Sequence, residues 1–197
     1  PPKLIVASVA VRIDQKWARS VGIGPGVGTV AQGDHRARHA VQSRQATRPV
    51  MRALGLVDAI DPRYALEMAP RLAAFSEDVE RTVGDVPVTY IGHSYGGSIL
   101  GTAERFGLTA DRVVYAEAAG AGVGVHDPAD WHNRNPAVLR FSMTAPGDVI
   151  GLVQGFPTGP HGADPDRMPG VIPLATGRRL TGWPMIGPST HGDVLNE

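Results

Sequence analysis

The stretch VPVTYIGHSYGG, residues 86–97, determines how the rest of the chain is interpreted. Residues 86–91 are mostly apolar and rich in β-branched side chains, a composition that predicts a buried strand. Residues 98–106 have the composition of a helix, and Gly107 follows as its expected end. The residues between them, GHSYG at 92–96, are therefore predicted to make a sharp turn from a strand into a helix.

Ser94 lies at the centre of this turn, in the pattern Gly92-x-Ser94-x-Gly96. Because the turn is so tight, a side chain at either glycine would collide with the adjoining strand or helix, and Ser94 must take a strained backbone. Such a turn lifts a serine hydroxyl to the carboxyl edge of a sheet, where ligands bind in open α/β folds. The pattern predicts that Ser94 is a nucleophile; the alternative is a chance match in a glycine-rich chain.

Outward from the turn, short apolar segments alternate with helical ones. Strands are predicted at 3–13, 20–24, 112–116, 138–143 and 171–175, and helices at 33–53 and beyond Asp61-Pro62. In the second helix Pro70 is expected to mark the true start or a kink. The apolar face of that helix is expected to consist of Met68, Leu72, Phe75, Val79 and Val83. Alternation of this kind predicts the α/β class, with a mostly parallel sheet flanked by helices. The length of 197 residues predicts one domain, 1–197, without a large lid, and truncation at one or both ends is left open.

A serine nucleophile needs a histidine base and a carboxylate that orients it, in the chain order Ser, Asp or Glu, His. The histidines after Ser94 are His126, His132, His161 and His191. His191 lies beyond the last predicted strand and fits the base best, with His161 as the second choice. Asp148 follows the predicted strand 138–143 and is the expected acid, while Glu117, after the strand before, is its rival.

Two backbone N–H groups are expected to hold the oxyanion that forms when Ser94 attacks. The N–H of Tyr95 lies at the start of the predicted helix, where backbone donors point outward. The second donor should come from a loop after an earlier strand, and the glycine-rich residues 24–28 fit this description. Val27 is the predicted donor, and Gly28 is nearly as well placed.

The chain resembles an α/β-hydrolase family that is common in actinobacteria and was formerly described as a domain of unknown function. The resemblance rests on PGVGT at 25–29, IGHSYGG at 91–97, APGD at 145–148, HGADP at 161–165 and STHGD at 189–193, and it spans nearly the whole chain. It implies the α/β-hydrolase fold with a GHSYG nucleophile turn. It also implies triad roles for Ser94, Asp148 and His191, in agreement with the choice made from the residues.

The composition argues against several other classes of function. The formal net charge is zero, so no global charge draws the chain to nucleic acid or to an anionic membrane. The chain has no cysteine, which excludes a thiol nucleophile and Cys-ligated zinc. No apolar run is long enough for an integral membrane segment. A cytoplasmic location is slightly favoured, export is left open, and the oligomeric state is unknown.

Three weaker signals point to other ligands. Gly26-x-Gly28-x-x-Ala31 fits a dinucleotide fingerprint but lacks a strong preceding strand. The arginines of segment 33–53 are interpreted as a solvated helix face. His126, Asp127, Asp130 and His132, or His161, Asp164 and Asp166, have the side chains of a metal site, although Asp-Pro turns explain them more simply. No cofactor and no metal are therefore predicted.

The sequence thus predicts an esterase-like serine hydrolase acting on a small-molecule acyl substrate through an acyl-enzyme. The same groups would serve a thioesterase, an amidase or an acyltransferase, because pocket shape selects the leaving group and the acceptor. A catalytically silent hydrolase fold used as a binding module is the alternative from another class, and a metal hydrolase is a third.

Overall fold

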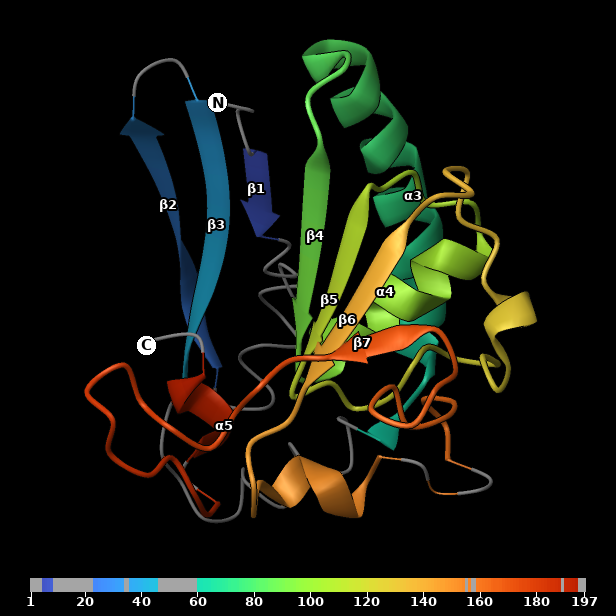
Figure 1. The fold of residues 1–197 in the computed structure, drawn as a ribbon. Helices are drawn as coiled ribbons and strands as arrows, with labels where there is room; N and C mark the ends of the chain where they lie inside the picture. The colour runs from blue at the N-terminus through green and yellow to red at the C-terminus, as the bar shows by residue number, and fades with distance from the viewer. Residues whose placement is uncertain are drawn as a thin grey trace.

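Five parallel strands form the central sheet of the computed structural model, which describes residues 5–8, 23–33, 36–45, 60–154, 156, 159–188 and 190–194 (Figure 1). In spatial order they are β1 (Ile5–Ser8), β4 (Val88–His93), β5 (Arg112–Ala116), β6 (Leu139–Met143) and β7 (Val171–Pro173). The predicted α/β class with a parallel sheet is confirmed. The strands predicted at 86–91, 112–116, 138–143 and 171–175 are observed with small differences at their ends, and β1 lies within the one predicted at 3–13, whose other residues lie outside the described ones.

Two helices pack against each other on one face of this sheet, α3 (Arg63–Val83) and α4 (Tyr95–Arg105) (Figure 1). The core between helices and sheet is fully or nearly fully buried, and it includes Ala65, Ala69, Tyr90, Ile99, Leu100, Val113 and Tyr115. Small residues on α3 and α4 let the helices approach each other and the sheet closely. The short helices η1 (Pro128–Asp130), η2 (Val149–Leu152) and α5 (Thr190–Asp193) belong to the connecting loops.

The register of the strands brings the site residues to one edge. His93, Ala116 and Met143 are neighbours across the sheet, and each is the last residue of its strand. The residues that follow them, Ser94 and Glu117 among them, therefore leave the sheet side by side at its carboxyl edge. Hydrogen bonds fix this arrangement, because Ser94 N–H donates to Ala116 O at 3.1 Å and Glu117 N–H donates to Met143 O at 2.7 Å.

The segment before residue 46 differs from the prediction. β2 (Ile23–Gly33) and β3 (Arg36–Gln45) form an antiparallel pair where a loop at 25–29 and a helix at 33–53 were expected. The register shifts between Gly24 and Val27, so Pro25 and Gly26 lie in an irregularity of the ladder. Proline has no N–H to donate and is tolerated at such places, which is why a turn-like sequence occurs within a strand.

Helix α3 also corrects two predictions. It begins at Arg63 and contains Pro70, so Pro70 does not mark its start, and the alternative of a kink at Pro70 stays a prediction. Its buried face is built on Ala65, Ala69, Leu72, Ala73 and Ser76, and the predicted core residue Phe75 is 46 % exposed. Leu72 is buried and Met68, Val79 and Val83 pack against the core as predicted, so Phe75 is the residue of this face that hydrophobic spacing misplaced.

No helix in the described ranges is long and apolar enough to cross a membrane. Within those ranges the strands are joined by loops, single helices and short turns, and no large lid is inserted among them.

Candidate active site

Ser94 occupies a strained turn between β4 and α4. Its backbone φ is +56°, a value that residues other than glycine rarely adopt, and it caps the N-terminus of α4. A Cβ atom at Gly92 would lie 2.7 Å from both Gly96 O and Gly97 Cα, so this position has no room for a side chain. Gly97 is equally constrained, because its Cβ would lie 2.2 Å from the Ala118 side chain. The predicted glycine requirement at 92 follows from the close approach of α4 to β4.

Three side chains meet at the carboxyl edge in the order that the sequence predicts. Ser94 Oγ lies 2.8 Å from His191 Nε2. On the other side of the ring, His191 Nδ1 lies 2.9 Å from Asp148 Oδ2 and 3.1 Å from Asp148 Oδ1. Because a carboxylate only accepts hydrogen bonds, Nδ1 carries the proton and Nε2 is left to accept the serine proton.

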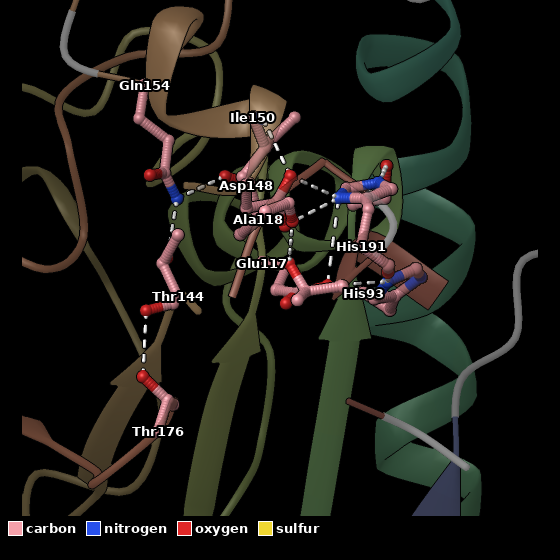
Figure 2. A network of polar contacts seen from close by, with 12 residues as sticks. His93, Glu117, Ala118, Thr144, Asp148, Ile150, Gln154, Thr176 and His191 are labelled. Atoms are coloured by element: carbon pink, nitrogen blue, oxygen red, sulfur yellow. Dashed lines mark hydrogen bonds and ion pairs between the residues drawn. The ribbon is translucent and has the colours of Figure 1, made fainter. Parts of the chain in front are cut away.

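Asp148 is held by its own turn as well as by His191. It is the N-cap of η2, and its Oδ1 accepts the Ile150 N–H at 2.9 Å (Figure 2). The Asp148 side chain is 0 % exposed, and His191 lies on α5, from the segment after β7. Asp148 therefore caps this turn and contacts His191 at the same time.

The second-choice base, His161, lies elsewhere. It is 1 % exposed, and its Nδ1 lies 2.9 Å from the hydroxyl of Ser98, which is itself fully buried. Its ring also packs edge-on against Tyr95, with centroids 5.0 Å apart. The part of the chain that the structure describes thus contains a Ser–His pair at the sheet edge and another inside the core.

Glu117, the rival acid, is present at the site without replacing Asp148. It is fully buried, has φ +46°, and its Oε2 lies 3.7 Å from His191 Nδ1 and 3.6 Å from His93 Nε2. These separations are longer than hydrogen bonds. Burial, and after it the negative charge of Asp148, raises the pKa of Glu117 to about 8.

His93, the residue before the serine, makes a contact that sequence reasoning did not predict. Its Nε2 lies 2.5 Å from the backbone carbonyl oxygen of His191, and the two rings are 4.9 Å apart. A carbonyl only accepts, so His93 Nε2–H is the donor and fixes the backbone of the base. Burial lowers the pKa of His93, which favours its neutral form. Its position inside the GHSYG motif was the available signal, but nothing in the sequence links it to residue 191.

The aspartates considered for a metal are engaged in turns, whereas His132 and His161 contact Arg105 O and Ser98 Oγ. Asp127 and Asp130 form a reciprocal capping box around η1. Asp164 Oδ1 accepts the Asp166 N–H at 2.9 Å. His93, Glu117 and His191 have ligand atoms within 4.8 Å of one another, yet both nitrogens of His191 already face Asp148 and Ser94. This trio therefore offers no open set of ligands.

Of the two predicted oxyanion donors, Tyr95 is the first residue of α4, and its role as a donor stays a prediction. Its side chain anchors the turn, since the hydroxyl accepts the Ala65 N–H at 3.1 Å and donates to Asp61 O. Val27 lies in β2, paired with Gln42, and not in the expected loop. Its role as second donor stays a prediction.

A family model described as alpha/beta hydrolase matches residues 7–157 of the chain. The chain belongs to the alpha/beta-hydrolase family. The match includes Ser94, Glu117 and Asp148, whereas His191 lies beyond it, so the pairing of His191 with Ser94 rests on the geometry. No curated protein and no solved structure gives a significant match. The actinobacterial origin implied by the resemblance stays a prediction.

Proposed function

We propose that this hydrolase is an esterase-like serine hydrolase that cleaves an ester-type acyl bond through an acyl-enzyme. One observation carries the proposal: the unbroken path from Ser94 Oγ through the His191 ring to Asp148, at 2.8 Å and 2.9 Å. A serine hydroxyl becomes a useful nucleophile when a base at this distance takes its proton. The strained backbone at Ser94 supports the assignment, because strain of this kind is found at functional turns.

The proposed reaction has two halves. His191 Nε2 takes the Ser94 proton while Oγ attacks the acyl carbonyl, and the imidazolium then gives that proton to the leaving alkoxide. Water next gives a proton to His191 and attacks the acyl-serine, and the proton returns to Ser94 as the acid leaves. Asp148 keeps the productive tautomer and stabilises the imidazolium. The N–H of Tyr95, with that of Val27 as the second predicted donor, would hold the oxyanion.

Apolar side chains beside Asp148 support an apolar acyl group in the substrate. Val149 and Leu152 of η2 are 50 % and 79 % exposed, and Ile186 is 63 % exposed. Ile186 belongs to the loop that packs on Gly147, since its Cγ2 would lie 3.8 Å from a Cβ there. A panel of p-nitrophenyl esters of graded chain length would measure how kcat/KM depends on the length of the acyl chain that this apolar surface would contact.

Labelling by a fluorophosphonate probe tests the nucleophile, because the probe reacts only with an activated serine. Wild type is expected to label and Ser94→Ala to lose labelling and ester hydrolysis by several orders of magnitude. Ser98→Ala is the matched control, because it removes the hydroxyl of the other Ser–His pair. Circular dichroism checks that both variants fold. An unlabelled wild type would favour the silent binding module, and labelling lost only in Ser98→Ala would move the nucleophile.

A further inference from the structure

Glu117 is a buried carboxyl group beside the proposed triad that the reaction described above does not use. Both of its oxygens are inaccessible, and among the described residues no N–H or O–H group makes a hydrogen bond to either of them. A carboxylate left in this state would lose its hydration without compensation. The group is stable there only if it carries a proton, and its O–H then needs an acceptor.

Asp148 is the acceptor that the geometry provides. Asp148 Oδ2 and Glu117 Oε2 both lie beside His191 Nδ1, at 2.9 Å and 3.7 Å, and the charge of Asp148 helps to raise the pKa of Glu117 (Figure 2). Two carboxylates at such a distance cannot both be ionised at low cost, so one of them holds the proton. Asp148 accepts from Ile150 N–H and from His191, which favours its charged form, whereas Glu117 lacks such donors.

Hydrogen bonds fix the backbone around Glu117. Its N–H is bonded to Met143 O at 2.7 Å, and Gln154 Nε2 donates to the next carbonyl, Ala118 O, at 2.7 Å. Ala119 N–H in turn donates to Ser94 O at 2.9 Å. The left-handed φ of Glu117 is held by these bonds on both sides, and strain of this kind persists only where the surroundings fix it.

We propose that Glu117 is a positioning residue that stays a neutral carboxylic acid and donates a hydrogen bond to Asp148, so that the two carboxyl groups hold one negative charge beside His191. The role in positioning rests on the proposed function, whereas the protonation does not. Several charged or titratable groups face Glu117: His93 from β4, Asp148 from the loop after β6, and His191 and Asp193 from α5. The backbone N–H of Ala145 is the neighbour that favours its ionised form, although it does not reach hydrogen-bond geometry with either oxygen.

Ionisation of Glu117 would place a second negative charge 3.7 Å from His191 Nδ1 and would repel Asp148. This repulsion would separate the carboxyl pair and move Asp148 away from His191 Nδ1, so His191 would lose the partner that keeps its productive tautomer and stabilises its imidazolium. The pKa of about 8 locates this change, and reactivity should fall as the pH rises through that value. In Glu117→Gln a neutral amide takes the place of the acid, donates to Asp148, and cannot ionise.

The experiment measures the rate of fluorophosphonate labelling from pH 5 to 10 in wild type, Glu117→Gln and Glu117→Leu. Wild type should lose at least about threefold above pH 8, Glu117→Gln should keep its plateau there, and Glu117→Leu should be about tenfold slower near pH 7, because a hydrogen bond to a charged group is lost. Equal rates for the Gln and Leu variants, or the same alkaline fall in wild type and Glu117→Gln, would overturn the proposal.

A second measurement does not depend on activity or on the folding of the Leu variant. The raised pKa means that folded protein binds a proton that unfolded protein has released between the ordinary glutamate value and about 8. As the pH rises through that window, the stability of wild type should therefore fall, and the Tm of Glu117→Gln should rise relative to the Tm of wild type. Glu104→Gln is the control, because Glu104 is equally buried but paired with Arg140. A Tm difference for Glu117→Gln that stays constant with pH would overturn the protonation, whereas an unlabelled wild type with the expected Tm trend would overturn only the proposed function.

Discussion

Two carboxyl groups, Asp148 and Glu117, lie near the His191 imidazole, and they differ in the hydrogen-bond donors that reach them. Asp148 accepts from the Ile150 N–H and lies 2.9 Å from His191 Nδ1, whereas Glu117 is 0.8 Å farther from the same nitrogen (3.7 Å against 2.9 Å). A carboxylate with donors keeps its charge, and one without them takes a proton. Local backbone geometry, and not sequence position alone, therefore favours Asp148 as the residue proposed to orient the base.

Asp148→Asn tests this difference. The substitution keeps the volume but removes the charge that favours the productive tautomer, so kcat/KM for a p-nitrophenyl ester should fall by about 10³ to 10⁴. Glu117→Gln should be much milder, because the amide can still donate to Asp148. A severe Glu117→Gln defect beside a mild Asp148→Asn one would assign the acid to the end of β5.

The proposed triad residues should also act as a unit. Once His191 is removed, Asp148 has no base left to orient, so Asp148→Asn/His191→Ala should be scarcely slower than His191→Ala alone. The same ester assay measures all three variants. Losses that multiply in the double variant would show that the two residues act independently. An active His191→Ala would assign the base role to His161, the second choice.

The predictability of the site residues follows from how local each signal is. Ser94 could be predicted because a glycine-flanked turn leaves a pattern within five residues. Asp148 and His191 followed from chain order, since each comes after a predicted strand. The bond from His93 to His191 O spans 98 positions and depends on where α5 is placed, so the sequence carries no trace of it. The same holds for the protonation of Glu117, which depends on burial.

At the scale of elements, the strand–turn–helix unit of β4 and α4 holds Ser94 in place. Its strand and its helix were predictable because they combine apolar runs with clear end signals, including Gly107, whose φ is +85°. The β2–β3 pair was not, because two periodicities compete there. Arginines 44, 48 and 52 recur at helical spacing, while positions 36, 38 and 44 also fit the two-residue period of a strand, and pairing with β2 decides the outcome.

Gly92→Ala tests the packing of this unit. The added methyl group would lie 2.7 Å from backbone atoms of Gly96 and Gly97, so α4 must shift away from β4. We expect a loss of about 1–3 kcal/mol in the free energy of unfolding, measured by urea denaturation. Labelling by the fluorophosphonate probe should fall as well, because Ser94 moves with the turn.

Gly151→Ala is the matched control for that variant. Gly151 lies in η2 and is not among the glycines with positive φ, and a Cβ atom added there would meet no other atom within 4 Å. Its stability and labelling should stay close to wild type. If the two variants were equally stable, the close approach of α4 to β4 would not be what requires a glycine at position 92.

At the scale of the whole molecule, one buried carboxylate joins the layers far from the proposed triad. Glu104, at the last turn of α4, accepts bonds from Arg140 of β6 at 2.7 Å and from the Tyr115 hydroxyl of β5 at 2.8 Å. The Arg140 guanidinium also lies 4.5 Å from the centre of the Trp131 ring. A hollow of about 500 Å³ lies at the opposite, amino end of β4 and β5 and is lined mainly by polar residues, so the triad and this hollow are at different ends of the sheet.

Arg140→Met tests what this network contributes. The Arg140 side chain is 16 % exposed and Glu104 is fully buried, so the substitution leaves a buried charge without its partner. Breaking such a pair costs about 3–5 kcal/mol, whereas an exposed pair contributes about 0–1 kcal/mol. Arg81→Met is the matched control, because Arg81 and Asp78 are 68 % and 71 % exposed. Urea denaturation should show a large loss for the first variant and almost none for the second.

Restoring electroneutrality should recover part of that loss. In Glu104→Leu/Arg140→Met neither charge remains, so the double variant should be more stable than the sum of the two single losses predicts, with Tyr115 left to find another acceptor. The labelling rate per folded molecule should not change in any of these variants, because Glu104 lies at the far end of α4 from Ser94. Additive losses would mean that Glu104 and Arg140 stabilise the fold separately. A slower labelling rate would mean that the contact between Glu104 of α4 and Arg140 of β6 affects the position of Ser94.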